Sequence, residues 1–163
     1  MGRDSTWTNK DGLVVGFGAR SEDLVGKHTG DTGVLNEVVY HVVGTNLGAA
    51  IKGYSGHDAV IPTGAIIHDA ELFVDTSFVG ASGTLDMEFV KLGGTTYGAN
   101  GIDAAIAVAT LVAGYTVTCD GVDVDASVVP LTEPVFISAN YNTTAFTAGS
   151  ATLVVRYIVP DAA

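Results

Sequence analysis

Apolar and polar positions alternate most clearly in the middle of the chain. Residues 84–92 alternate with a period of two, which predicts a strand with one buried face. The expected inward residues are Leu85, Met87 and Phe89, and the expected outward residues are Asp86, Glu88 and Val90. Residues 65–79 show a similar alternation of apolar and polar positions, and turn residues 80–83 join the two segments. This pattern predicts a β-hairpin that packs one face on a core.

The segment at 65–79 is long enough for one long strand or two consecutive ones. Within it, one face carries apolar side chains and the other carries carboxylates. The apolar set is Ala70, Leu72 and Val74, and the acidic set is Glu71 and Asp75. Further strands are predicted at residues 35–43, 115–119, 134–140 and 151–159. The last of these is apolar on both faces, so we expect it to be central in a sheet or partly covered by a neighbouring chain.

One helix is predicted between the strands. Residues 102–112 are rich in alanine, and Ile102, Ile106, Ala109 and Val112 recur at helical spacing. Seven or eight short strands, glycine-rich turns and one short helix predict an all-β fold, a β-sandwich. The inserted helix and the uneven strand lengths favour a jelly-roll-like form over an immunoglobulin-like one. We expect residues 1–64 to form an extended, glycine-rich N-terminal arm with one or two strands, and residues 65–163 to form the sandwich body.

Composition narrows the class of protein. The 163 residues are 47% hydrophobic, which is too apolar for a disordered chain. The formal net charge of −11 leaves no basic patch to displace counterions from phosphates, so nucleic acid is not an expected partner. The longest apolar helical stretch is about 11 residues, whereas a membrane span needs about 20. The N-terminus lacks the apolar core of a secretory signal, so we expect a protein made in a cytoplasm.

The charge is unevenly divided along the chain. Residues 1–52 hold five basic and six acidic residues, a net of −1. Residues 53–155 hold one basic residue, Lys91, and eleven acidic ones, a net of −10. Chance is one explanation of this division. The other is an arm that docks on a partner while acidic bodies repel one another and stay soluble.

Each segment that begins like a motif for catalysis or cofactor binding lacks at least one residue that the motif requires. No cofactor, metal site or enzyme activity is therefore expected. The acidic loop with Asp120, Asp123 and Asp125 has oxygen ligands of the kind calcium binds, but not EF-hand spacing, so a solvated loop is the simpler interpretation. Asp86 and Glu88 are two carboxylates on one strand face, which most simply serve solubility. Cys119 is the only cysteine, which excludes an internal disulfide, and we expect a buried, unreactive thiol.

Both ends of the chain resemble a known family. Residues 7–18 (WTNKDGLVVGFG) resemble the opening of small virion proteins of tailed bacteriophages, particularly those of marine and cyanobacterial hosts, and residues 148–158 (AGSATLVVRYI) are similar to their last strand. Those proteins resemble capsid decoration, or head cement, proteins. The resemblance implies a virion protein on the outer head surface, made in the host cytoplasm. It also implies homo-oligomers, commonly trimers, that clamp neighbouring subunits of the major capsid protein.

The arm supplies the expected capsid contacts. We expect the apolar residues to act as anchors and the basic ones to meet acidic patches on the capsid. The anchors are Trp7, Leu13, Val15 and Phe17, and the basic residues are Arg3, Lys10 and Arg20. The alternative is an arm that folds back to complete its own sandwich. An alternative function is a glycan- or host-binding module of a head or tail fibre, with Tyr97, Tyr115 and Tyr141 as candidate sugar platforms.

Overall fold

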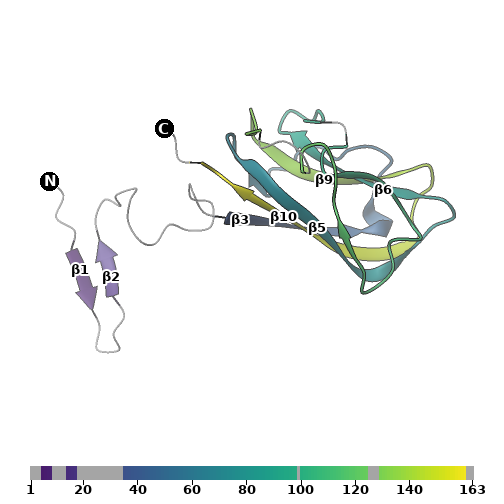
Figure 1. Cartoon of the computed structure of the whole chain (residues 1–163), viewed down its shortest axis with the longest axis horizontal. Helices are drawn as coiled ribbons and strands as arrows, with labels where there is room; N and C mark the ends of the chain where they lie inside the picture. Colours follow the sequence, from purple (N-terminus) through teal and green to yellow (C-terminus); the bar gives the residue numbers. More distant parts are fainter. Residues whose placement is uncertain (1–4, 9–13, 18–34, 99, 125–128, 161–163) are drawn as a thin grey trace.

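The computed structural model describes residues 5–8, 14–17, 35–98, 100–124 and 129–160, the first two ranges by their backbone only. Two four-stranded antiparallel sheets face each other and form a β-sandwich (Figure 1). The elements are β1 (Ser5–Thr8), β2 (Val14–Phe17), β3 (Leu35–Val43), the 3₁₀ turn η1 (Gly44–Asn46), β4 (Val60–Ile61), β5 (Ile66–Val79), β6 (Thr84–Lys91), β7 (Asp103–Ala107), β8 (Thr116–Thr118), β9 (Val135–Asn142) and β10 (Ala148–Ile158). The all-β sandwich predicted from the sequence is confirmed.

The strand order is that of a jelly roll. The sheets have the orders β3-β10-β5-β8 and β4-β9-β6-β7. Strands β3 to β10 therefore pair first with last, second with seventh, third with sixth and fourth with fifth, all antiparallel. A ribbon of antiparallel pairs folded over itself gives this order, which places consecutive strands in different sheets for most of the chain.

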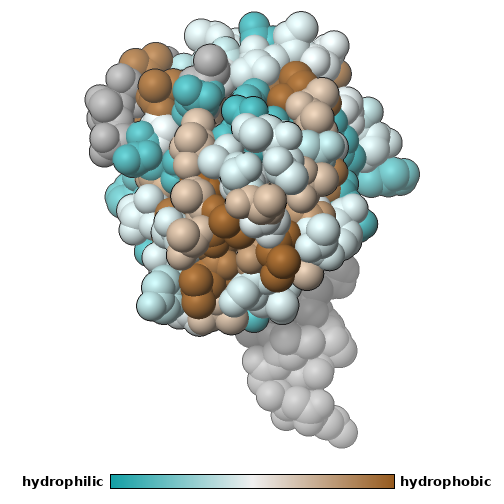
Figure 2. Space-filling view, turned by 90° about the vertical axis from the view of Figure 1, so that its right-hand side faces the viewer, coloured by the Kyte–Doolittle hydropathy of each residue, from teal (hydrophilic) through white to brown (hydrophobic). Residues whose placement is uncertain are grey.

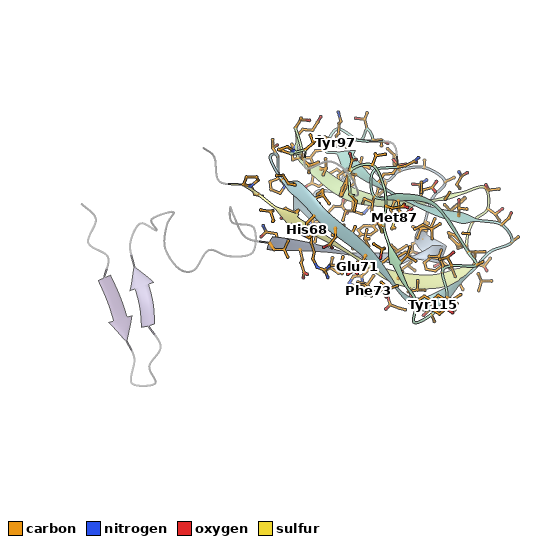
Figure 3. The ribbon with its side chains drawn as sticks, in the orientation of Figure 1. His68, Glu71, Phe73, Met87, Tyr97 and Tyr115 are labelled. Carbon is orange, nitrogen blue, oxygen red and sulfur yellow. The ribbon has the colours of Figure 1, made fainter. Side chains whose placement is uncertain are left out.

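The core lies between the sheets and follows the predicted alternation. Leu72, Leu85, Met87 and Phe89 have no exposed surface, and Met87 lies between the two layers (Figure 3). Residues 66–79 form one long strand. Strand β10 is central, between β3 and β5, as its apolar pattern predicted. The two sheets thus share one apolar interior.

The β-hairpin predicted for residues 65–79 and 84–92 is wrong, because β5 pairs with β10 and β8 while β6 pairs with β9 and β7 in the opposite sheet. The turn at residues 80–83 therefore crosses from one sheet to the other, and each strand keeps its predicted apolar face toward the shared core.

The helix predicted at residues 102–112 is wrong. Strand β7 occupies the first half of this segment and pairs with β6. A spacing of four residues puts Ile102 and Ile106 on one side of a strand as well as of a helix, so periodicity could not distinguish the two. Backbone pairing with β6 outweighs the helix preference of alanine here. In the described part of the chain, η1 is the only helical segment, and no helix there is long and apolar enough to cross a membrane.

Strands β3 and β4, which the sequence analysis grouped with the arm, belong to the two sheets. All nine residues of β3 pair with β10, and β4 pairs with β9. Nearer the N-terminus, β1 and β2 form an antiparallel ladder in which Trp7 pairs with Val15 and Ser5 with Phe17. The residues that follow β2 up to position 34 lie outside the described part of the chain.

Glycine is required where β10 begins. Gly149 has a φ of 122°, in the region that favours glycine, and it lies in an irregularity of the pairing between β10 and β5. A Cβ atom there would come within 2.5 Å of the Phe78 ring. The missing side chain lets Phe78 pack edge-on against Phe146, with ring centroids 5.1 Å apart.

Candidate interaction surface

The outer face of the sheet β3-β10-β5-β8 is the candidate functional site. Register fixes its rows, because residues paired across strands point to the same side. We call this surface the open face. Its residues are Leu35, Glu37, Val39, His41 and Val43 of β3, Ser150, Thr152, Val154, Arg156 and Ile158 of β10, and Asp69, Glu71 and Phe73 of β5. Figure 3 shows Glu71 and Phe73 on the outer side of β5, away from Met87.

Arg156 anchors the charged part of the open face. Its Nε donates to Glu37 Oε1 at 2.9 Å, and its Nη1 donates to Asp69 Oδ1 at 2.8 Å and Glu71 Oε2 at 3.0 Å. These bonds raise the pKa of the guanidinium. One cation therefore ties three strands together through three carboxylates, and the cluster keeps an excess of negative charge.

A second polar group lies two outward rows from Arg156, beyond the row of Val39 and Val154. The Thr152 hydroxyl donates to Asp75 Oδ2 at 3.0 Å, and its oxygen lies 3.3 Å from His41 Nδ1. A hydroxyl has a single proton to donate, so this contact requires a proton on Nδ1 of His41. His41 is thus held as a donor to its own sheet while its ring stays on the outer side of β3.

Apolar side chains separate these polar groups and remain exposed. Leu35, Val39 and Val43 are 46%, 50% and 39% exposed along β3, and Phe73 is also exposed on β5. Scattered exposed apolar residues are normal, but three in alternation on one strand form a stripe. This stripe gives the open face the apolar and charged composition of a protein-binding surface.

More apolar surface lies at the end of the sandwich where β3 and β5 finish. Val79 and Val112 are exposed there, near Val43. Their proximity follows from the pairing of β10 with both strands and from a bond of 2.9 Å between the backbones of Phe78 and Leu111. Figure 2 looks onto this end and shows apolar side chains gathered among hydrophilic ones. The open face therefore continues around the end of the sandwich.

The outer face of the other sheet is covered by the chain itself. Phe136, Ser138 and Val90 are fully buried there although they point away from the core. The segment after η1 lies over two of them: Lys52 N donates to Ser138 Oγ at 2.8 Å, and the Tyr54 ring is 5.4 Å from that of Phe136. Val90 is bridged to Thr96 of the loop that follows β6. Val90 was predicted to face outward, as it does, but its side chain is buried there. We call this outer face the covered face.

A salt bridge fixes the covering segment. Lys52 Nζ lies 2.8 Å from Asp58 Oδ1, and Ser55 donates to Asp58 Oδ2 through its backbone and its hydroxyl. Burial alone would raise the pKa of Asp58, but these bonds outweigh it and lower that pKa to about 2. Asp58 therefore stays ionised at neutral pH and holds the segment in a closed turn.

The acidic loop at residues 120–125 is partly turned inward. Asp123 packs against Gly98 and Gly101, at distances that leave no room for a Cβ atom on either glycine, and burial raises its pKa. Asp125 lies outside the described residues. Among those the structure describes, no three acidic, histidine or cysteine side chains group as metal ligands.

The carboxylates of β6 and β7 have structural partners. Asp86 Oδ1 accepts a bond of 2.7 Å from Ala105 N, and Glu88 Oε2 accepts one of 2.9 Å from the Thr96 hydroxyl. Asp103, buried at 7% exposure, has its pKa raised to about 6 by burial and by Asp120 and Asp86. Asp86 supports the backbone at Ala105, whose φ is 57°, so its carboxylate stabilises a strained position within β7, where the pairing with β6 is irregular.

Cys119 is buried as predicted, and burial raises the pKa of its thiol to about 12, which keeps it protonated and unreactive. The candidate sugar-binding tyrosines are not brought together. The Tyr97 hydroxyl accepts a hydrogen bond from the Thr132 backbone N–H. Tyr97 and Tyr141 both pack against the core. Tyr115 is 60% exposed at the far end of the sandwich from Tyr97 (Figure 3). These rings do not form the shared platform that the glycan alternative needs.

The expected capsid contacts fall where the structure describes least. Arg3, Lys10, Leu13 and Arg20 lie outside the described residues. The other three, Trp7, Val15 and Phe17, lie on the ladder of β1 and β2. The cluster around Arg156 and the partners of His41 were not predicted from the sequence, because both depend on the register of three strands. The apolar pattern on both faces of β10 was the available signal.

Comparisons with known structures support the topology. A chain of the Ralstonia phage GP4 capsid is 19% identical, with a TM-score of 0.52, over 80% of this chain and 88% of that one. A chain of the cyanophage Pam1 capsid asymmetric unit is 20% identical, with a TM-score of 0.53, over 87% of this chain and 98% of that one. The chain shares its fold with chains of two phage capsids. At this level of identity the likeness is one of fold.

The sequence itself matches no protein-family model, and a search of curated proteins gives no significant match. The two capsid chains are matched over most of their length, so each is close to this jelly roll in size. The likeness therefore extends over a whole chain in each case and is not limited to one domain of a much larger protein.

Proposed function

We propose that the chain is a structural virion protein that binds the outer surface of a phage head and joins neighbouring subunits of the major capsid protein. The observation that carries the proposal is the jelly roll shared, at nearly full length, with chains of two phage capsids. The resemblance of residues 7–18 and 148–158 to head cement proteins points the same way. It adds the expectation of a trimer.

The open face supports a binding role for the body. Its exposed apolar stripe and its charged cluster offer the two kinds of contact that protein interfaces combine. The net charge of −10 on residues 53–155 makes binding to the phosphates of DNA unfavourable. We therefore propose protein partners in the capsid, and no catalytic or cofactor chemistry.

The arm is proposed to provide the anchors on the capsid. Trp7, Leu13, Val15 and Phe17 would enter apolar pockets between subunits, and Arg3, Lys10 and Arg20 would meet acidic patches. The backbone register of the ladder pairs Trp7 with Val15 and Ser5 with Phe17, so three of the proposed anchors belong to one two-stranded element.

Co-sedimentation with phage heads that lack the protein tests the proposal. We expect the full chain to sediment with heads and not with DNA. Replacing both Trp7 and Phe17 with Ala should weaken binding by about 100-fold if each anchor contributes about 1–2 kcal/mol. Replacing the exposed Val122 with Ala is the matched control and should leave binding unchanged. Absence of the chain from purified virions would contradict the proposal.

A further inference from the structure

The four edges of the two sheets differ in how they are protected. The edge strands are β3 and β8 in one sheet and β4 and β7 in the other. Strand β8 has three residues and β4 has two, while β7 has five and an irregularity in its pairing with β6. Short strands and bulges are the usual means of keeping an edge from pairing with another chain. Strand β3 has nine residues and no such feature.

The β3 edge is long, regular and apolar. It pairs with β10 without a register shift, contains no proline, and in the described part of the chain is paired on one side only. On the open face, its apolar residues alternate with Glu37 and His41. These apolar residues are among the most exposed large hydrophobic ones of the body. An edge of this kind is a template for a further strand.

We propose that the β3 edge binds the β3 edge of a second copy of this chain, antiparallel, about a two-fold axis at Val39. The strand is nearly self-complementary in this register. Leu35 then faces Val43 of the other copy, Glu37 faces His41, and Val39 faces Val39. The two sheets would join into one continuous sheet of eight strands, with apolar pairs alternating with pairs of a carboxylate and an imidazole.

The register follows from the length and charges of the strand. Centring the axis on Val39 pairs all nine residues, whereas a shift of two residues leaves strand ends unpaired and places Glu37 opposite an apolar residue. A shift by one would move the core-facing side chains to the outside. The chosen register also avoids opposing carboxylates, which matters because the body is strongly acidic.

A second copy suits this edge better than an unrelated strand. Both sides of the contact carry the same surface, as in any two-fold interface, so a strand that complements itself needs no other partner. His41 is already oriented by Thr152, and Glu37 is already held by Arg156. These side chains are thus pre-organised before pairing, which lowers the entropy lost on association. This two-fold contact differs from the contacts that would hold the proposed trimer together. It would therefore join two trimers to each other.

Charge-swap variants at the axis provide the test. Val39→Lys places two like charges face to face in the paired form, as does Val39→Asp, so each variant alone should raise the dissociation constant by about tenfold or more. Mixing the two variants places opposite charges at the axis and should restore pairing. Native mass spectrometry would count the copies, with Val122→Lys as the matched control at an exposed position on a loop.

The expected wild-type result is an even number of copies, a dimer or a pair of trimers, and V39K should halve it. A trimer in the wild type, or an unchanged number of copies in V39K, would overturn the inference while leaving binding to heads untouched. Val39→Cys gives an independent measurement. Because Cys119 is buried, oxidation should link two copies through position 39 alone, and failure to form that dimer would contradict the register.

Discussion

The two sheets of the sandwich differ in how far their outer faces are exposed to solvent. On the sheet β4-β9-β6-β7, the chain's own segment after η1 lies over part of the outer face, where Phe136 and Ser138 are buried. The sheet β3-β10-β5-β8 keeps Leu35, Val39 and Phe73 exposed beside a charged cluster. Side chains of the same type therefore stabilise the fold on one face and remain available to a partner on the other.

This difference separates stability from binding within one small domain. The covered face acts as a second, minor core, because Tyr54 and the backbone of Lys52 close it. The open face contributes less to the free energy of unfolding of the isolated chain, since its apolar groups remain in water. Substitutions on the two faces should then differ in size and in kind.

A matched pair of phenylalanines gives the largest expected contrast. Phe136→Ala on the covered face should lower the free energy of unfolding by about 3–5 kcal/mol, because a fully buried ring is lost. Phe73→Ala on the open face should cost about 1 kcal/mol or less, since its ring is partly in water. Chemical denaturation of both variants measures this. Equal losses would mean that the two faces do not differ as described.

The hydroxyl groups of the two faces should show a smaller contrast. Ser138→Ala removes the acceptor of the Lys52 backbone N–H and should cost about 1–2 kcal/mol, because a polar group beneath the covering segment loses its partner. Thr152→Ala on the open face removes a bond to Asp75 that water can replace, and should cost about 0.5 kcal/mol or less. Thermal unfolding of the two variants would rank them. A larger loss for Thr152→Ala contradicts the comparison.

Buried charge provides a contrast that depends on pH. Asp103, on the edge strand of the covered sheet, has a pKa raised to about 6 in the folded chain. The folded state then binds its proton more tightly than the unfolded state, so stability is lost as pH rises from about 4 to 6. Asp103→Asn should stabilise the chain by about 1 kcal/mol at pH 7.5, and this gain should vanish near pH 4.

The matched control is Asp75→Asn on the outer side of β5, where the carboxylate is exposed. It should give no comparable gain at pH 7.5, because no burial penalty is relieved there. Unfolding curves at both pH values separate the two variants. A gain for Asp103→Asn of the same size at pH 4 would show that the buried charge is not its cause.

Much of the sandwich could be predicted from alternation alone. Leu85, Met87 and Phe89 face the core as expected, and residues 35–43 form a strand with the predicted bounds. Alternation could not distinguish a strand from a helix at Ile102 and Ile106, because a spacing of four suits both. The outcome there depends on the neighbouring β6, which lies far outside any local window of sequence.

The candidate surface was less predictable than the core. Arg156, Glu37 and Asp69 come from three strands that are separated by long stretches of sequence, and only their register brings them together. The covering of Phe136 by Tyr54 gave no signal either, because residues 44–64 lack a period and were expected to be part of an arm. Tertiary pairing, which a single sequence does not display, decides both features.

The cluster around Arg156 should show the smallest effect and the clearest dependence on salt. Arg156→Gln leaves Glu37, Asp69 and Glu71 close together without their cation, so the melting temperature should fall at low ionic strength. Added salt screens exposed charges over a Debye length of about 8–10 Å and should recover most of that loss. The loss in Phe136→Ala should persist in salt, because it comes from a buried ring. Thermal unfolding at two salt concentrations therefore distinguishes an electrostatic open face from an apolar covered one, and a salt-independent loss in Arg156→Gln would contradict that distinction.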